Sequence, residues 1–485
     1  MSRFAASALV FFASASVLVL EILAGRLLAP YVGVTLETFT GIIGTILAGI
    51  ALGAWLGGRA ADRTDPRKLL APLLIVGGAL AFLSIPIVDW LGSGMRGGTP
   101  ATIVTLAALG FFAPAAVLSA VTPVVVKIRL SSLEETGRVV GMLSAVGTAG
   151  ALVGTFSTGF ILVAAWPTRP VIRALAIALV IVGVALAART RTWSTGLVVV
   201  ALVAGAMSFA SAHPCEVESA YFCARVIADE DDPTRRTLWL DTLRHSKVDV
   251  DDPTHLEFSY AQTLSDVIES LAPPGEPLDV LHIGGGGFSM PRYLRATRPG
   301  THSTVLELDP KLIEIGREHL ALTLEDIDVI TGDARLNIED VQLQSMDLVI
   351  GDAFGGISVP WHLTTREFVE AIRDVLRPGG TYALNLIDYG DRRFARAELA
   401  TIADVFEHVA VFAPEGRLGE DPEGGNFIMV ASDEPIEVAA ILARNASRGD
   451  DEAVLVGEEL TRFIGDARVL TDDHAPVDQL IQPLP

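Results

Sequence analysis

The apolar and polar positions divide the chain into two halves of different character. In residues 1–212, apolar stretches long enough to cross a hydrocarbon core of about 30 Å alternate with short polar loops. These stretches lie at residues 4–29, 39–60, 69–91, 101–126, 139–165, 171–188 and 196–212. The pattern predicts an all-α transmembrane bundle of about seven helices over residues 1–212, a multi-pass protein of the cell membrane whose partner is the lipid bilayer.

The loops between these stretches differ in charge, which predicts how the helices are oriented. The loops after the second, fourth and sixth stretches hold most of the basic side chains: Arg59, Arg63, Arg67, Lys68, Lys127, Arg129, Arg138, Arg189 and Arg191. Basic loops remain in the cytoplasm, so the N-terminus is expected inside. About seven crossings then place the C-terminal half outside the cytoplasm, whereas one stretch that does not cross would place it inside. We slightly favour the outside.

Glycines recur at four-residue spacing within two of the apolar stretches. The second stretch contains Gly49, Gly53 and Gly57, and the fifth contains Gly150 and Gly154. Small residues at this spacing let helices approach closely in lipid, so we expect these glycines at helix–helix contacts.

The second half begins with short alternating runs and continues with strands and helices in regular order. Residues 221–227 and 237–241 predict strands of a small β domain over residues 213–253. A helix is expected from about residue 254 to 271. Apolar runs then lie at residues 278–283, 304–308, 327–330, 346–350 and 381–387, with helical segments between them. This order predicts a Rossmann-like α/β domain over residues 254–485 with a parallel, doubly wound sheet.

Glycines and acids follow the ends of these predicted strands. They are Gly284, Gly285, Gly286 and Gly287 after the first strand, Glu307 at the end of the second, Asp333 and Ala334 after the third, and Asp352 after the fourth. Ligands of open α/β sheets bind at this edge, where glycine admits a nucleotide-like ligand and a carboxylate accepts the ribose hydroxyls. Taken singly, each residue also suits a tight turn, a helix N-cap or a solvated strand end.

The net charge of the chain indicates which classes of binding partner are compatible with it. The chain has 36 basic and 58 acidic side chains, a net charge of −22. Residues 1–212 hold 14 basic and seven acidic side chains, so the acidic excess lies in the C-terminal half. An acidic half repels phosphate backbones, which excludes nucleic acid as a partner. It suits either a solvated surface or a cationic ligand.

The two cysteines, Cys215 and Cys223, both follow the last apolar stretch. A disulfide, two buried free thiols and a two-cysteine metal site are all compatible with this placement. A disulfide would indicate an oxidising compartment.

The motifs at the strand ends resemble those of the spermidine synthase family. Leu281-His-Ile-Gly284-Gly-Gly-Gly287 is similar to its glycine loop, and Val305-Leu-Glu307-Leu-Asp309 to its ribose-binding strand end. The resemblance covers residues 217 to about 432. It implies aminopropyl transfer from decarboxylated S-adenosylmethionine to putrescine on a Rossmann-like methyltransferase fold. The implied ligands are therefore an adenosyl sulfonium donor and a small-molecule amine, with no metal, and a homodimer is a further option.

The resemblance also implies roles for individual residues. Those implied to bind the donor are Gly284, Gly285, Gly286, Glu307, Asp333 and Ala334. Asp352 matches the first acid of the family's catalytic loop, and Tyr260 matches a tyrosine near the acceptor. Trp361 and His362 lie where the family has its substrate-covering loop, so they are expected to bind substrate or to form the wall of the pocket.

Three positions depart from the family pattern. Gly287 and Gly355 stand where the family has aspartates, one of which holds the ammonium group of the donor, and His245 stands where it usually has glutamine. Asp352 is still expected to be the catalytic base, with His245 as an alternative whose unperturbed pKa is about 6.5. Without an acid at position 287, intact S-adenosylmethionine is not repelled, so S-adenosylmethionine-dependent methyl transfer is an alternative chemistry.

The pattern of the whole chain resembles bacterial proteins in which a transporter-like half is fused to a spermidine-synthase-like half. The segment from Thr471 to Leu480 is part of this resemblance, and we expect it to pack back on the domain rather than to bind a metal. The first hypothesis is a membrane-anchored transferase of polyamine biosynthesis. The alternative from another class is a catalytically inactive, polyamine-binding or transport-linked module.

Overall fold

The computed structural model describes residues 2–95, 98–130, 132–356, 358–419 and 424–481. These residues form two compact units. The first comprises Met1–Arg225 with Leu240–Thr242, and the second comprises Val226–Trp239 with Leu243–Pro485. The first is mainly helical, and the second contains an eight-stranded sheet with helices between its strands.

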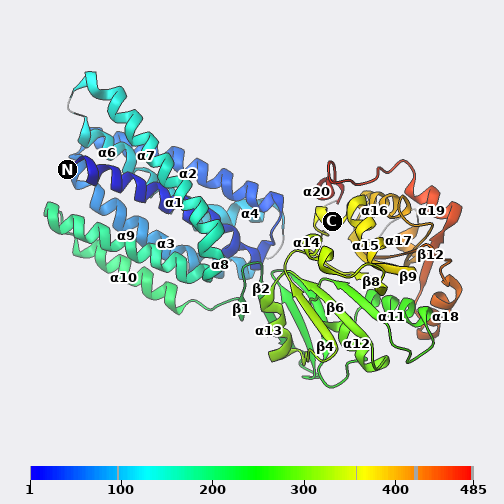
Figure 1. The fold of residues 1–485 in the computed structure, drawn as a ribbon. Helices are drawn as coiled ribbons and strands as arrows, with labels where there is room; N and C mark the ends of the chain where they lie inside the picture. The colour runs from blue at the N-terminus through cyan, green and yellow to red at the C-terminus, as the bar shows by residue number, and fades with distance from the viewer. Residues whose placement is uncertain (1, 96–97, 131, 357, 420–423, 482–485) are drawn as a thin grey trace. The chain divides into compact units, whose positions relative to one another are not determined.

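Long apolar helices make up most of the first unit (Figure 1). Its main helices are α1 (Arg3–Val32), α2 (Leu36–Arg63), α3 (Leu70–Gly94), α4 (Pro100–Ala107), α5 (Ala113–Ser119), α6 (Val121–Arg129), α7 (Thr136–Ser157), α9 (Thr168–Thr190) and α10 (Thr195–Ala210). Within the described residues, six helical spans are long and apolar enough to cross a membrane. The seventh predicted segment forms α10, a shorter apolar helix of 16 residues. Seven crossings therefore remain a prediction, while the apolar helical region itself is confirmed.

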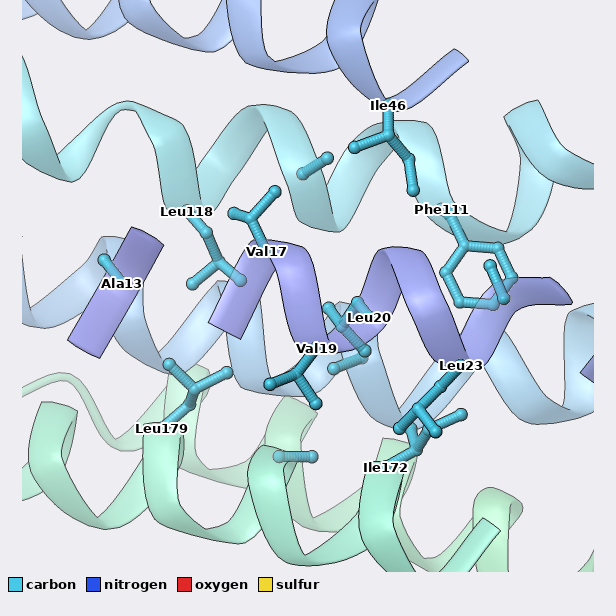
Figure 2. Close-up of a cluster of buried hydrophobic side chains, with 14 of the residues drawn as sticks. Ala13, Val17, Val19, Leu20, Leu23, Ile46, Phe111, Leu118, Ile172 and Leu179 are labelled. Atoms are coloured by element: carbon cyan, nitrogen blue, oxygen red, sulfur yellow. The ribbon is translucent and has the colours of Figure 1, made fainter. Parts of the chain in front are cut away.

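The helices of this unit pack through glycines and a shared apolar core. A Cβ atom at Gly53 of α2 would lie 1.9 Å from the backbone oxygen of Ala116 in α5, and one at Gly150 of α7 would lie 2.3 Å from that of Phe11 in α1. These contacts confirm that the repeated glycines permit close helix approach. Figure 2 shows part of the core, where side chains from several helices, including Leu20, meet out of contact with solvent.

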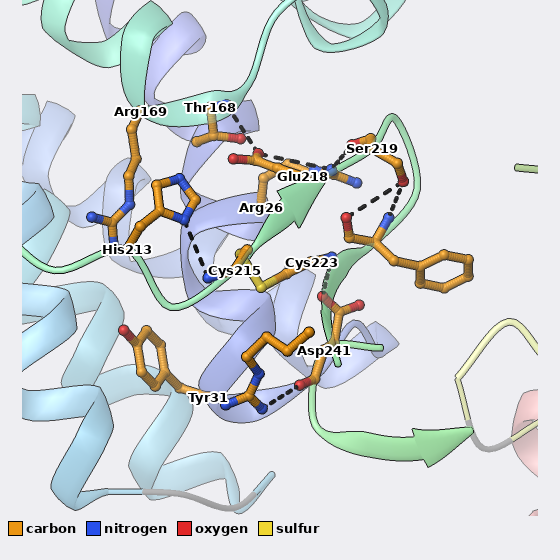
Figure 3. The surroundings of a disulfide bond; sticks show 12 residues. Arg26, Tyr31, Thr168, Arg169, His213, Cys215, Glu218, Ser219, Cys223 and Asp241 are labelled. Atoms are coloured by element: carbon orange, nitrogen blue, oxygen red, sulfur yellow. Dashed lines mark hydrogen bonds and ion pairs between the residues drawn. A yellow bond between two sulfur atoms is a disulfide. The ribbon is translucent and has the colours of Figure 1, made fainter. Parts of the chain in front are cut away.

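Cys215 and Cys223 form a disulfide in the segment that follows α10 (Figure 3). Free thiols and a two-cysteine metal site, the alternatives left open by the sequence, are therefore wrong. Since this segment belongs to the first unit, the disulfide closes a loop next to the ends of the helices.

Charged side chains hold this disulfide segment against helix ends. The guanidinium of Arg169, at the start of α9, lies 2.5 Å from the carboxylate of Asp89 in α3 and donates to the backbone oxygen of Ala212 at 2.8 Å. Arg26, near the end of α1, donates to the backbone oxygen of Ala220 at 2.8 Å. The end of α10 therefore lies at the same end of this unit as the carboxyl ends of α1 and α3.

Four short strands follow the helices and form a sheet in the order β1-β2-β3-β4. They are β1 (Val217–Glu218), β2 (Cys223–Ala228), β3 (Arg235–Leu240) and β4 (Leu243–Asp249). The small β region expected from the alternating runs is therefore present.

The large sheet has the strand order β12-β10-β11-β9-β8-β5-β6-β7. Its strands are β5 (Asp279–Ile283), β6 (His302–Glu307), β7 (Ile327–Thr331), β8 (Met346–Gly351), β9 (Leu376–Asp388), β10 (His408–Pro414), β11 (Gly425–Ser432) and β12 (Glu452–Val456). The five strands from β5 to β9 are parallel, as predicted. The expectation of a wholly parallel sheet is wrong, because β10, β11 and β12 join it through antiparallel pairs.

Both faces of this sheet are covered by helices. Successive side chains of a strand point to opposite faces, and those of β5 are buried on both. On one face, Leu281 and Ile283 of β5 share a core cluster with residues of α15 (Arg366–Val375) and α16 (Arg393–Ala403). On the other face, Val280 shares a cluster with residues of α11 (Ser259–Leu271), α12 (Ser289–Thr297) and α18 (Val438–Arg448). The remaining helices of the second unit are α13 (Pro310–His319), α14 (Ala334–Asn337), α17 (Glu415–Leu418), α19 (Gly457–Ile464) and α20 (Val477–Leu480).

Candidate active site

A glycine turn follows β5 and packs against the end of β8. Gly284 and Gly286 have φ angles of +94° and +50°, which glycine adopts most readily. A Cβ atom at Gly284 would lie 2.6 Å from the backbone oxygen of Asp352. The chain turns here because glycine permits both the left-handed backbone and this close approach to the neighbouring strand end.

Glu307, at the end of β6, points at this turn. Its Oε2 accepts hydrogen bonds from the backbone N–H of Gly285 at 2.7 Å and of Gly286 at 3.3 Å, and its Oε1 accepts from the N–H of Asp309 at 2.8 Å. Burial raises the pKa of Glu307, while these three hydrogen bonds act in the opposite direction. The contact follows from the parallel pairing of β5 with β6, which brings their carboxyl ends together.

Asp352 follows β8 and lies in a chain of hydrogen bonds. Its Oδ2 accepts from the hydroxyl of Tyr260 in α11 at 3.3 Å, and its Oδ1 accepts from Nδ2 of Asn385 in β9 at 2.8 Å. Oδ1 of Asn385 in turn accepts from Nδ2 of Asn426 in β11 at 2.8 Å. Burial raises the pKa of Asp352 to about 6. The structure therefore brings together Tyr260 and Asp352, two of the residues singled out by the sequence.

Asn385 and Asn426 were missed by sequence reasoning. Asn385 is 1% exposed and interrupts the apolar run of a central strand, which is a recognisable signal because a buried amide needs partners. Asn426 lies on an antiparallel strand that was not predicted, so its contact with Asn385 had no basis in the sequence pattern.

Asp333 and His362 meet at the end of β7. Oδ1 of Asp333 accepts from the backbone N–H of Arg335 at 2.8 Å and caps α14, while Oδ2 lies 3.2 Å from Nε2 of His362. Ala334, beside the cap, is 8% exposed. The structure thus joins the expected adenine-side segment to the expected covering segment, and their roles in ligand binding remain predictions.

Trp361 precedes His362 and is 51% exposed. It lines a cavity of about 550 Å³ together with Gly355, Asp473 and Asp478. The tail that contributes these acids packs back on the unit, because Asp472 accepts hydrogen bonds from Arg335 and Thr365 at 2.8 Å and 2.7 Å. Among the described residues, no group of three or more histidine, cysteine, aspartate or glutamate side chains is placed to hold a metal ion.

The two glycines that replace expected aspartates have different surroundings. The N–H of Gly287 donates to the hydroxyl of Ser246 in β4 at 2.9 Å, and a Cβ at position 287 would lie 2.6 Å from the Cβ of Ser246. At Gly355, the nearest atom to an added Cβ is Cγ of Pro360 at 3.7 Å. Position 287 is therefore closed to a side chain, whereas position 355 has room for one.

His245, the alternative base, lies on β4 beside Ser246. Burial lowers the pKa of His245 to about 4, so its imidazole is neutral near pH 7. A neutral imidazole can accept a proton, but its low pKa makes it a weaker base than the Asp352 carboxylate. His245 as a base remains a prediction.

Comparison with known proteins shows which proteins the second unit is similar to. Residues 257–390 match the family model described as the spermine/spermidine synthase domain. A polyamine aminopropyltransferase of Chromobacterium violaceum is 27% identical over 176 residues, which are 36% of this chain and 65% of that protein. One of Vibrio vulnificus is 33% identical over 134 residues, which are 27% of this chain and 44% of that protein. The matches thus span less than two thirds of the length of these two relatives.

Among solved structures, a probable spermidine synthase from Corynebacterium glutamicum is similar to this chain, with 29% sequence identity and a TM-score of 0.48. The similarity covers 52% of this chain and 94% of that one.

The fold and the converging strand ends define a Rossmann-like α/β unit with a candidate ligand site at its parallel edge. The family model and the aminopropyltransferase relatives then show what this unit is similar to: residues 257–390 match the spermine/spermidine synthase domain, and the two relatives are polyamine aminopropyltransferases.

Proposed function

We propose that the chain is a membrane-anchored transferase that moves an aminopropyl group from decarboxylated S-adenosylmethionine to a small amine. The observation that carries the proposal is the convergence of three groups at one edge of the sheet: the glycine turn, Glu307 turned towards it, and Asp352 held by Tyr260. The polyamine aminopropyltransferase relatives support the class of reaction.

In this proposal the donor lies along the ends of β5, β6 and β7. Gly284, Gly285 and Gly286 form the backbone wall of the donor site, and the remaining lone pair of Glu307, on Oε1, accepts a hydrogen bond from a ribose hydroxyl. Asp333 and Ala334 lie on the adenine side, with Trp361 and His362 as the covering segment.

Asp352 is the proposed proton acceptor. The nitrogen of the amine forms a bond to the propyl carbon attached to the sulfonium sulfur, the carbon–sulfur bond breaks, and its electron pair stays on sulfur as the neutral thioether. The proton lost by the amine passes to the carboxylate of Asp352. Tyr260 donates to that carboxylate, and this contact supports its proposed place beside the acceptor.

The test is transfer by the full chain in detergent, with the donor labelled in its aminopropyl group and a panel of diamines and polyamines. We expect a labelled amine and 5′-methylthioadenosine in equal amounts, and loss of both in Asp352→Asn. Donor binding without transfer to any amine would contradict the proposal and would favour the catalytically inactive polyamine-binding module.

Methyl transfer is the second candidate, and the closed surroundings of Gly287 favour it. Ser246 occupies the space in which an acid would repel the carboxylate of intact S-adenosylmethionine. Transfer of label from methyl-labelled S-adenosylmethionine to the same amines, with no aminopropyl transfer, would select this candidate.

The membrane location and sidedness belong to the same proposal. Six long apolar helices support membrane insertion. The disulfide supports an oxidising side for the segment after α10. The ends of α1, α3 and α10 lie together, away from the basic loops that are expected in the cytoplasm. We therefore favour an extracytoplasmic C-terminal unit.

A further inference from the structure

The hydrogen-bonded chain behind Asp352 crosses three strands of the sheet. Asn385 lies on β9, next to β8, which Asp352 follows, and Asn426 lies on β11, the next strand beyond. In the antiparallel pair of β9 and β11, Asn385 is opposite Ile428, so Asn426 is its diagonal neighbour on the same face. The strand pairing therefore fixes the contact between the two amides.

The orientation of each amide follows from the charge on Asp352. An ionised carboxylate only accepts hydrogen bonds, so Asn385 must turn its NH₂ towards Asp352 and its oxygen away. That oxygen needs a donor, which Nδ2 of Asn426 supplies at 2.8 Å. A flipped Asn385 would set its oxygen against the carboxylate and its NH₂ against that of Asn426, so both contacts would become repulsive.

We propose that Asn385 and Asn426 are positioning residues that keep Asp352 ionised and aimed at the acceptor amine. Asn385 acts on the carboxylate directly, and Asn426 acts through Asn385 by fixing which end of its amide faces Asp352. The inference rests on the proposed function, because it takes Asp352 as the proton acceptor.

Burial disfavours the charged form of Asp352, so its carboxylate needs hydrogen-bond donors to remain ionised. Burial raises the pKa of this carboxyl to about 6, and the hydrogen bonds from Asn385 and then Tyr260 limit the rise. In the part of the chain that the structure describes, the side-chain hydrogen bonds to this carboxyl come from these two groups, on β9 and α11. Without the donor on Asn385, the carboxyl would stay protonated to higher pH and could not accept a proton.

The test replaces each amide by the isosteric leucine in the full chain and follows the ionisation of Asp352. The midpoint is read from the carboxyl band in infrared difference spectra against Asp352→Asn, and from the acid limb of kcat against pH where an amine is turned over. We expect Asn385→Leu to raise the midpoint by about one to two pH units, the size of one lost hydrogen bond to a charged group. Asn426→Leu should raise it by less.

The matched control is Asn445→Leu. Asn445 is a buried asparagine in α18 that donates to the carboxylate of Asp450 and accepts from the backbone N–H of Glu452. It should leave the midpoint unchanged. An unchanged midpoint in Asn426→Leu would overturn the inference, and this variant decides the matter even if Asn385→Leu fails to fold. The infrared titration needs no turnover, so the inference stands or falls separately from the proposed reaction, which fails if no donor binds.

Discussion

At the level of single residues, Gly287 and Gly355 differ in the space around them. Both stand where the family resemblance leads to aspartate, and each is expected to weaken the hold on a cationic group. Ser246 fills the space beside Gly287, whereas Gly355 faces a cavity of about 550 Å³. The packing around position 287 therefore leaves no space for an aspartate side chain, whereas the packing around position 355 leaves room for one.

This difference predicts opposite outcomes for two aspartate substitutions. Gly355→Asp should fold as the wild type does and bind diamines more tightly, because its carboxylate has room and can attract an ammonium group. Gly287→Asp should lower the free energy of unfolding by about 1–3 kcal/mol, since its Cβ would overlap with Ser246. Thermal unfolding of the full chain and calorimetry with diamines measure both effects.

The double variant Gly287→Asp with Ser246→Gly is the control for this pair, because it removes the overlapping Cβ. It should recover most of the lost stability. Equal stability of Gly287→Asp and Gly355→Asp would show that the packing at Ser246 is not the constraint.

The pKa of Asp352 predicts a pH dependence with a defined sign. Its folded-state pKa of about 6 lies above the ordinary value of 3.8, so burial favours the protonated carboxyl. The contribution of this group to folding stability is therefore full below about pH 4 and is lost as the pH rises through about 6. The rate of aminopropyl transfer should change in the opposite direction: it should rise as the pH increases through about 6, because the base Asp352 ionises.

The measurement is kcat against pH between about 5 and 8 at saturating donor and amine. An acid limb with a midpoint near 6 is the expected result. A profile that is flat across this range would mean that Asp352 is not the group whose ionisation limits the reaction.

Some residues of the candidate site could be predicted from the sequence, and others could not. Glu307 and Asp352 could be placed because each follows a strong apolar strand, and parallel strands align their carboxyl ends. Ser246 could not be placed against Gly287, because a contact between a β hairpin and a loop about 40 residues later leaves no pattern in either segment. The same holds for the contact of Asn426 with Asn385.

At the level of elements, α11 carries Tyr260 and is fixed at its carboxyl end by one arginine. Arg298 is 0% exposed and donates to the backbone oxygens of Ile268, Ala272 and Pro273 at 3.0 to 3.3 Å. It also lies 3.2 Å from the carboxylate of Glu269. The last four carbonyls of a helix lack partners within the helix; this guanidinium supplies one to Ile268 of α11 and also binds the two residues that follow the helix, Ala272 and Pro273.

Removal of this guanidinium should loosen α11. We expect Arg298→Leu to lower the opening free energy of the backbone amides of residues 259–271 by about 3–5 kcal/mol, because a partly buried carboxylate and several carbonyls lose a partner that is itself fully buried. Hydrogen–deuterium exchange of the full chain measures this locally. Arg317→Leu, on the exposed face of α13, should change it by less than about 0.5 kcal/mol, and a similar effect of both variants would refute the capping role.

The elements themselves were predictable to different degrees. The five parallel strands follow from apolar runs separated by helical segments. The direction of β10 and β11 does not, because their apolar runs, such as residues 409–413 and 427–431, read the same for parallel and antiparallel strands. The length of α10 also differs from expectation, because the helix ends at Ala210, two residues before the predicted boundary.

At the level of the whole molecule, the side of the membrane on which the C-terminal unit lies determines which donor molecules it can reach. In the proposed arrangement α10 crosses the membrane, and the C-terminal unit follows it on the side where α10 ends. The disulfide and the basic loops both favour the extracytoplasmic side. A donor would then have to be available on that side.

Reporter cysteines test this sidedness, because the two natural cysteines are buried and bonded to each other. In intact cells, a membrane-impermeant maleimide should label Glu276→Cys, an exposed position of the C-terminal unit. It should not label Arg67→Cys, in an expected cytoplasmic loop, until the membrane is opened. The reverse pattern would place the C-terminal unit in the cytoplasm.

The central claim is that the glycine turn and Glu307 together bind the nucleoside of an adenosyl sulfonium donor. Calorimetric titration of the full chain with decarboxylated S-adenosylmethionine, compared between the wild type and Glu307→Gln, tests it most directly. We predict saturable binding at one site per chain, weakened at least about 10-fold by the substitution, because a ribose hydroxyl loses a charged acceptor. Absence of binding to the wild type, or equal affinity of the two proteins, would contradict the claim.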